Sequence, residues 1–156
     1  MKNKYILDAC CGGKTFWFDK NHENALFIDR RQEQHKLNYK RNRQEIKIEP
    51  DIVCDFKNMP FDDEQFNLVV FDPPHAKFNK SSIMYKKYGT LDDDFKEDLR
   101  QGFEECFRVL KKHGTLIFKW AESGIKVDEI LNVVKQKPLF GHRTTRTTIW
   151  IAFMKF

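Results

Sequence analysis

The sequence predicts an α/β fold built on a doubly wound, mostly parallel sheet that a C-terminal antiparallel strand closes. Three observations lead to this prediction: apolar runs typical of strands recur along the chain, helical patterns lie between them, and a long apolar stretch ends the chain. Strands that alternate with helices favour a parallel sheet with helices on both faces. The apolar runs occupy residues 4–8, 25–29, 51–55, 66–72, 114–120 and 147–156.

The clearest helix is predicted over residues 91–112. Its apolar side chains recur at helical spacing. Thr90 with Asp93 forms a capping box at its start, and Gly114 supplies the stop after a basic last turn. The apolar positions are Leu91, Phe95, Leu99, Phe103, Cys106, Phe107 and Leu110.

The remaining segments carry weaker patterns. A second helix is predicted over residues 124–136, and a third over 31–42, where the periodicity is weak. The tail indicates a hairpin, in which a short strand near 139–143 or 144–148 precedes the final strand 148–156.

Length and composition are those of one globular domain spanning residues 1–156. Hydrophobic residues make up 40% of the chain and charged residues 33%, with no repeat, low-complexity tract or linker. No apolar stretch approaches the roughly 20 residues of a membrane span, and the amino terminus runs into the first strand without room for a signal peptide. We therefore expect a cytoplasmic protein with no membrane partner.

The four cysteines, at positions 10, 11, 54 and 106, show neither a zinc spacing nor a disulfide framework. They are expected to be small, buried, apolar residues. No metal site is predicted, and no feature of the sequence indicates an oligomeric state.

Basic residues gather in two runs. The net charge of +5 favours a polyanionic partner. Residues 30–48 hold seven Lys/Arg against two Glu, which fits a solvated face and a binding surface equally well. Residues 75–91 hold four lysines, three aromatic residues and no acid, which favours a substrate-binding loop. The predicted contacts in this loop are Phe78, Lys77, Lys80, Lys86 and Lys87.

Four consecutive predicted strands end in aspartate, and ligands of a doubly wound sheet bind outside the carboxyl ends of its strands. After the first strand, Gly12 lets backbone approach a nucleoside cofactor. Asp29 lies where an acid accepts hydrogen bonds from ribose hydroxyls. Asp55 is placed to accept from an adenine amino group, with Phe56 available to cover the ring. The four carboxylates are Asp8, Asp29, Asp55 and Asp72.

Residues 72–75, Asp-Pro-Pro-His, end the apolar run 66–71. The prolines fix φ and remove two N–H donors, so the loop is stiff and offers carbonyl acceptors. Asp72 and the carbonyl of Pro73 would hold an exocyclic amino group by its hydrogens, and His75 would stack on the base. Next to a nucleoside cofactor, this arrangement indicates methyl transfer from S-adenosylmethionine to an amino nitrogen.

These segments resemble class I S-adenosylmethionine-dependent methyltransferases, which have a Rossmann-like fold. Ile6-Leu-Asp-Ala-Cys-Cys-Gly-Gly13 is similar to the first motif of that family, and Met59-Pro-Phe-Asp-Asp-Glu-Gln-Phe-Asn-Leu-Val-Val70 to its stretch entering strand four. Arg108-Val-Leu-Lys-Lys-His-Gly-Thr-Leu116 is similar to its turn into strand five. Asp72-Pro-Pro-His75 resembles the catalytic motif of the amino-methylating branch, and the whole is most similar to small phage and prophage enzymes described as DNA methyltransferases.

The resemblance implies S-adenosylmethionine as the cofactor and the N6 amino group of adenine in DNA as the preferred acceptor. A base inside a duplex would have to flip out, and the lysines after the motif would hold the flanking phosphates. The implied catalytic residues are Asp72, Pro73, Pro74 and His75. The implied cofactor-binding residues are Asp8, Cys10, Gly12, Asp29, Asp55 and Phe56.

The chain also departs from the family pattern. Cys10 and Lys14 stand where the first motif has its outer glycines, and the eleven residues 14–24 leave the usual first helix shortened or lost. His75 replaces an aromatic residue, and no segment is long enough for a separate target-recognition domain. RNA, a protein or a small molecule stays open as the acceptor, as does a catalytically idle module that binds nucleic acid or cofactor.

Overall fold

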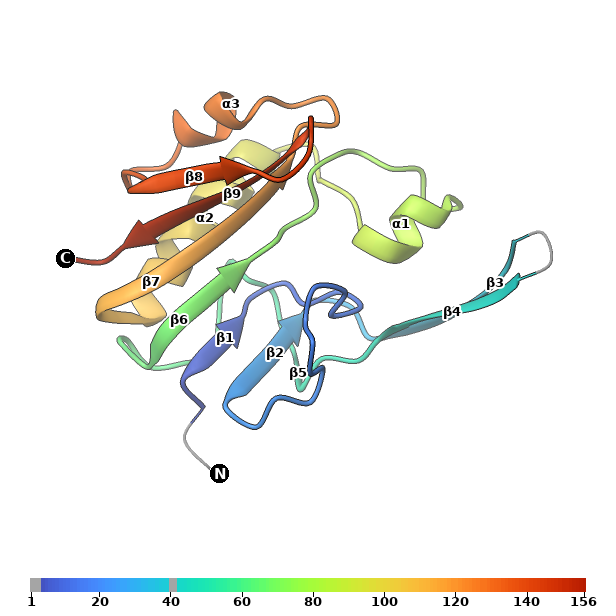
Figure 1. Cartoon of the computed structure of the whole chain (residues 1–156), viewed down its shortest axis with the longest axis horizontal. Helices are drawn as coiled ribbons and strands as arrows, with labels where there is room; N and C mark the ends of the chain where they lie inside the picture. The colour runs from blue at the N-terminus through green and yellow to red at the C-terminus, as the bar shows by residue number, and fades with distance from the viewer. Residues whose placement is uncertain (1–3, 40–41) are drawn as a thin grey trace.

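A seven-stranded sheet forms the centre of the computed structural model, which describes residues 4–39 and 42–156 (Figure 1). In chain order its strands are β1 (Ile6–Asp8), β2 (Ala25–Asp29), β5 (Ile52–Val53), β6 (Phe66–Phe71), β7 (Leu110–Ala121), β8 (Phe140–Arg143) and β9 (Thr148–Met154). Their order across the sheet is β5-β2-β1-β6-β7-β9-β8. The first five are parallel, and β9 is antiparallel to both β7 and β8. The predicted fold class is confirmed.

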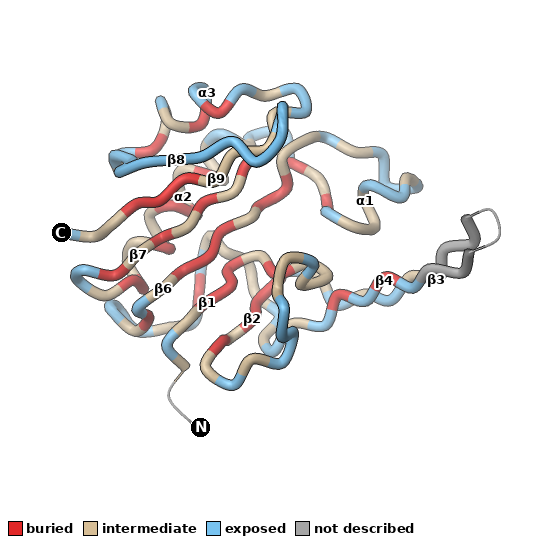
Figure 2. The backbone as a smooth tube through the Cα atoms, in the orientation of Figure 1, coloured by how far each residue is buried: buried red, intermediate tan, exposed pale blue. Residues whose placement is uncertain are grey.

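The main core lies where the helix α2, Phe95–Val109, covers the sheet. Phe71 of β6 and Phe118 of β7 pack against Phe103 of this helix, with ring centroids 5.6 and 4.9 Å apart. Gly102 allows the close approach, because a Cβ there would lie 2.7 Å from the Phe56 ring. Figure 2 shows the buried residues concentrated along the central strands, whereas β8 at the sheet edge is exposed.

The connection from β1 to β2, residues 9–24, is a loop without a helix along its whole described length. Parallel neighbours are usually joined through a helix. Here the indole of Trp17 packs edge-on against Phe27 at a centroid distance of 4.8 Å, within a small cluster apart from the main core. The expected loss of the first helix is confirmed.

Helix α2 is shorter than the predicted helix 91–112. The predicted capping box of Thr90 and Asp93 is wrong, because the hydroxyl of Thr90 accepts the N–H of Phe78 and no side-chain hydrogen bond caps α2. The predicted stop at Gly114 is also wrong, because β7 begins directly after the helix and this glycine lies inside it.

The predicted helix over residues 31–42 is wrong. The chain forms an antiparallel hairpin of β3 (Glu33–Tyr39) and β4 (Asn42–Ile48), with residues 40–41 outside the described part. This separate two-stranded sheet projects from the body of the molecule (Figure 1). A segment this polar has no apolar stripe with which a helix could pack. In the hairpin, by contrast, alternation buries Ile46 and Ile48 at its base.

Two short helices complete the fold. Helix α1, Ile83–Tyr88, lies in the predicted substrate loop; the Ser82 hydroxyl accepts the Tyr85 N–H at its start, and Gly89 follows it with φ 73°. Helix α3, Val127–Leu131, occupies only part of the predicted helix 124–136. The short strand predicted near 139–143 is confirmed by β8.

Candidate functional site

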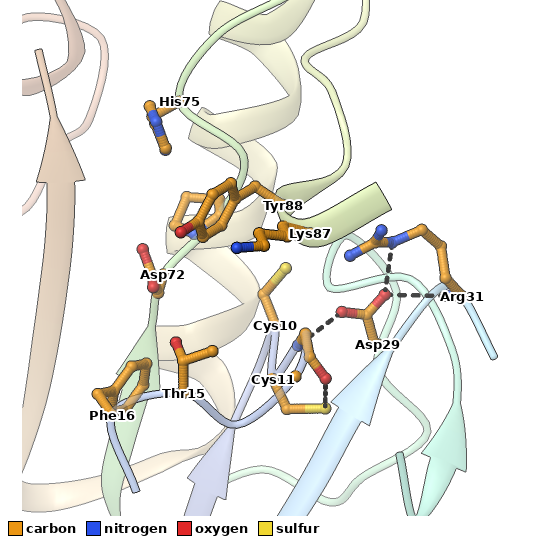
Figure 3. A pocket seen from close by; sticks show the side chains of 13 residues that line it. Cys10, Cys11, Thr15, Phe16, Asp29, Arg31, Asp72, His75, Lys87 and Tyr88 are labelled. Atoms are coloured by element: carbon orange, nitrogen blue, oxygen red, sulfur yellow. Dashed lines mark hydrogen bonds and ion pairs between the residues drawn. The ribbon is translucent and has the colours of Figure 1, made fainter. Parts of the chain in front are cut away.

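The candidate site lies at the carboxyl ends of β1, β2 and β6, where a doubly wound sheet binds its ligands. Figure 3 shows a pocket in which the turn after β1, residues 10–13, faces the end of β6 and the last residues of α1. We call this turn the glycine turn. Seven predicted site residues line it: Cys10, Gly12, Asp29, Asp72, Pro73, His75 and Lys87. Six residues that were not predicted complete the lining: Cys11, Gly13, Thr15, Phe16, Arg31 and Tyr88.

The Asp29 carboxylate holds the glycine turn in place. The N–H of Gly12 donates to Asp29 Oδ2 over 2.9 Å, and the N–H of Arg31 donates to Oδ1 over 2.9 Å. Gly12 has φ 48°, a conformation that disfavours residues with a Cβ. The Arg31 guanidinium spans from Asp29 Oδ1, at 3.3 Å, to the carbonyl of Tyr85 in α1, also at 3.3 Å. One buried carboxylate thus organises both the turn and the segment that lies over it.

Asp8 lies beneath the pocket and outside its lining. Its carboxylate is fully buried and accepts hydrogen bonds from Trp17 Nε1 at 2.7 Å and from the N–H of Cys10 at 3.3 Å. Burial raises the pKa of Asp8 to about 7, although the Trp17 hydrogen bond opposes this shift. In this structure Asp8 therefore supports the loop that carries the glycine turn.

We expect Asp8→Asn to make stability less sensitive to pH. The raised pKa means that the folded protein binds a proton between about pH 4 and 7 that the unfolded chain releases, so this site costs the wild type stability as pH rises. Asparagine keeps an acceptor for Trp17, loses the acceptor for the Cys10 N–H at every pH, and removes the pH-dependent cost. As pH rises from about 4 to 7, the free energy of unfolding of the variant should increase relative to that of the wild type by up to about 4 kcal/mol. Thermal unfolding across pH 4–7.5 measures it, with Asp19→Asn as an exposed control; a constant difference would contradict the assignment.

The Asp72 carboxylate forms an ion pair that the sequence reasoning missed. Lys119 Nζ lies 2.6 Å from Asp72 Oδ2, because the register of β6 and β7 pairs Phe71 with Phe118 and so brings the next two residues together. Burial raises the pKa of Asp72, whereas the Lys119 charge and hydrogen bond oppose this. The available signal in the sequence was a charged residue within the otherwise apolar stretch 116–120.

Aromatic rings flank this ion pair. Lys119 Nζ lies 5.9 Å from the ring centroid of Phe16 and 5.7 Å from that of Trp150, within cation–π range. These two rings meet edge to face at 5.5 Å. The Lys119 ammonium is thus held by the Asp72 carboxylate and by two aromatic rings. It comes from β7, an element separate from the loop that carries Asp72.

His75 is half-buried among aromatic rings. Its centroid lies 5.9 Å from both Phe78 and Tyr88 and 6.4 Å from Trp120. Burial, and next the charge of Lys119, lower the pKa of His75, so the imidazole is neutral at pH 7. A neutral ring in aromatic surroundings is suited to stacking on a planar substrate.

No protein-family model matches the sequence, and neither does any curated protein. Solved structures match the fold. The PH0226 protein from Pyrococcus horikoshii OT3 matches at a TM-score of 0.64 and 15% identity, over 99% of this chain and 83% of that chain. A TehB-like SAM-dependent methyltransferase from Corynebacterium glutamicum matches at 0.55 and 13%, over 100% and 82%. A geranyl diphosphate methyltransferase, solved in complex with SAM, matches at 0.56 and 11%, over 99% and 79%.

The chain has the class I methyltransferase fold. At these identities the likeness extends to the fold, and the site has to be argued from the residues of this chain.

Three predicted site residues lie beside the pocket of this class I methyltransferase fold without lining it. Asp55 accepts the N–H of Lys57 at 2.9 Å. Phe56 packs against Phe71 at a centroid distance of 5.1 Å and so faces the core. Phe56 and the buried Pro74 line a separate small hollow of about 20 Å³ next to α2. The roles of Asp55, Phe56 and Pro74 stay predictions.

The other predicted substrate contacts lie outside the pocket. Lys77 is exposed and pairs with Asp93 at 2.7 Å, and Lys80 is exposed in the loop before α1. Lys86 and Lys87 are half-buried in the last turn of α1, and only Lys87 lines the pocket. Phe78 reaches the site through its contact with His75.

Within the described residues, no group of three or more His, Cys, Asp or Glu side chains is arranged to hold a metal ion. The helices found there are too short or too polar to cross a membrane.

Proposed function

We propose that the protein transfers a methyl group from S-adenosylmethionine to an exocyclic amino nitrogen, with adenine in DNA as the preferred acceptor. The observation that carries this proposal is the position of Asp72, Pro73 and His75 after the end of β6, facing the glycine turn across one pocket. The class I methyltransferase fold and the SAM complex of one structural relative support the cofactor.

Two features of the pocket fit this cofactor. Burial and then the charges of three carboxylates, Asp29, Asp8 and Asp72, raise the pKa of the Cys10 thiol well above its usual range. Asp29 and Asp72 place two carboxylates at this pocket, and a carboxylate attracts a cation such as a sulfonium. At Gly12 a Cβ would meet only the carbonyl of Lys87, at 3.7 Å, so backbone is open to a ligand there.

Asp29 and Gly12 would hold the nucleoside part of the cofactor. Asp29 Oδ2 accepts one hydrogen bond, from Gly12, and a carboxylate oxygen can accept another. When bound, the cofactor supplies an activated methyl group on a good leaving group.

The chain itself then orients the acceptor. Asp72, whose ionised form the Lys119 ammonium favours, accepts a hydrogen bond from the amino group, and the Pro73 carbonyl accepts a second. Both bonds localise the nitrogen lone pair toward the methyl group, and the His75 ring holds the plane of the base. Alignment of the reacting atoms supplies a large share of the rate enhancement.

Radiolabelled methyl transfer to duplex DNA, single-stranded DNA, RNA and protein extract, run in parallel, tests the proposal. We expect label in DNA, and digestion should give N6-methyladenine. Label confined to RNA, protein or a small-molecule fraction would keep the amino-transfer mechanism and reject DNA as the acceptor. No label in any fraction, with S-adenosylhomocysteine still bound, would favour an idle binding module.

A further inference from the structure

A second and larger pocket lies between the base of the β3–β4 hairpin and α1. Its volume is about 330 Å³, within the range of small-molecule sites. The glycine turn forms its floor, since a Cβ on Gly13 would lie 3.6 Å from the carbonyl of Lys47 in β4. The hairpin thus does more than project from the molecule: its base forms one wall of a cavity.

Lysines from three separate elements line this pocket: Lys20 from the loop after β1, Lys47 from β4 and Lys87 from α1. Among the described residues of the lining, Glu45 is the only acid, and it is already engaged by Gln34 and lies 3.6 Å from Lys47 Nζ. Three cations facing one partly neutralised acid leave a positively charged cavity, which favours an anionic ligand.

Lys87 is the cation most available to a ligand. Lys20 Nζ donates to the carbonyl of Gly13 at 3.1 Å, which places this ammonium at the floor of the pocket. Among the side chains that the structure describes, those of residues 4–36 and 45–156, the ammonium of Lys87 has no hydrogen-bond or ion-pair partner. An unpaired, half-buried ammonium is a group that a phosphate would satisfy.

The charged pocket is continuous with the candidate active site. Gly13, Thr15, Lys87 and Tyr88 line both cavities. In Figure 3, Lys87 and Tyr88 lie over the glycine turn, with the Tyr88 ring on the side of Asp72. A ligand with its reacting group beside Asp72 can therefore extend past Tyr88 and place an anionic group among the lysines.

We propose that this pocket binds a backbone phosphate of the nucleic-acid strand next to the target base. The inference rests on the proposed function and narrows it, since it assigns the strand a path from the active site to the hairpin. The hairpin carries further basic residues beyond the pocket, with Lys36 on β3 and Arg43 on β4. The anion that could compete for the same lysines is the carboxylate of the cofactor.

The test compares a Lys20→Gln, Lys47→Gln double variant with wild type. A short fluorescein-labelled single-stranded DNA oligonucleotide is the probe, and anisotropy titrations at several salt concentrations give its affinity. We expect the affinity to fall at least about tenfold at low salt, as for a lost hydrogen bond to a charged group. The slope of log affinity against log salt should become shallower by about 0.7, the value for one phosphate contact on a single strand.

A Lys112→Gln, Lys137→Gln double variant is the matched control, because it makes the same charge change at exposed positions away from the pocket. The control should lower the oligonucleotide affinity by less than half as much as the Lys20→Gln, Lys47→Gln variant does. Calorimetric titration with S-adenosylhomocysteine should give wild-type affinity for both variants.

Three results would overturn the proposal. The first is a wild-type protein that does not bind the oligonucleotide, and the second is an equal loss of oligonucleotide affinity in both double variants. The third is a loss confined to S-adenosylhomocysteine affinity, which would assign the lysines to the cofactor. Because anisotropy does not require turnover, lysine-dependent binding without label transfer would reject the proposed function and keep the pocket. Label transfer to DNA, with the salt dependence of the Lys20→Gln, Lys47→Gln variant unchanged from wild type, would keep the proposed function and reject the phosphate-binding pocket.

Discussion

Asp72→Ala is expected to lower methyl transfer at least about 100-fold while the affinity for S-adenosylhomocysteine stays within about twofold. The reason is that the carboxylate would contact the acceptor amino group, and losing one aligned catalytic hydrogen-bonding group typically costs about 10²–10³ in rate. The proposed cofactor side of the pocket is organised by Asp29, which bonds Gly12 and Arg31 independently of Asp72.

Initial rates with the acceptor found in the labelling experiment measure the first effect, and calorimetry measures the second. Asp72→Asn separates charge from shape, because it keeps the volume of the side chain beside Lys119. Asp62→Ala, at an exposed position before β6, is the control that should behave as wild type. Unchanged turnover in Asp72→Ala would reject the catalytic assignment.

Lys119→Met is expected to shift the acid limb of the pH–rate profile upward by at least about one unit. An opposite charge at this distance lowers the pKa of a carboxyl by about 1–3 units, and here it opposes the burial that raises the pKa of Asp72. Without the ammonium, the pKa of Asp72 rises further and less of the ionised form is present at neutral pH. The rate should therefore fall at pH 7 and recover at higher pH.

Lys119→Arg tests whether this role depends on charge, since arginine keeps the cation beside Asp72. It should return the acid limb toward its wild-type position. A uniform loss of rate in Lys119→Met, with no change in the pH profile, would show that the lysine acts through packing against Phe16 and Trp150.

The central strands could be predicted from the sequence because they lie buried between parallel neighbours, and such strands appear in a sequence as apolar runs. The hairpin could not: Gln34 and Lys36 make one face of β3 polar, the other face begins with Glu33 and His35, and the pairing with β4 depends on contacts across the two strands. The capping prediction at Thr90 failed for a related reason, because its hydroxyl finds a tertiary partner in Phe78.

Of the four aspartates predicted at strand ends, Asp29 and Asp72 line the pocket, whereas Asp8 is buried beneath it and Asp55 lies beside it. Asp29 and Asp72 reach the pocket because parallel strands end at one edge of the sheet. Lys119 was missed because its neighbour is fixed by the register of β6 against β7, which spacing along the chain does not reveal. Phe56 lies at a predicted strand end, yet Gly102 leaves it room to turn into the core.

The loop that replaces the first helix has a consequence for motion. Trp17, Phe27 and Cys11 form a cluster that does not merge with the core under α2, so this region has few contacts to break before it opens. The amides of Lys14 and Trp17 should exchange hydrogen with solvent orders of magnitude faster than that of Phe118, in native-state exchange at neutral pH; equal protection would contradict this. The loop after β1, on the proposed cofactor side of the pocket, would then open locally while the hydrogen bonds between β6 and β7, which position Asp72 and Lys119, stay intact.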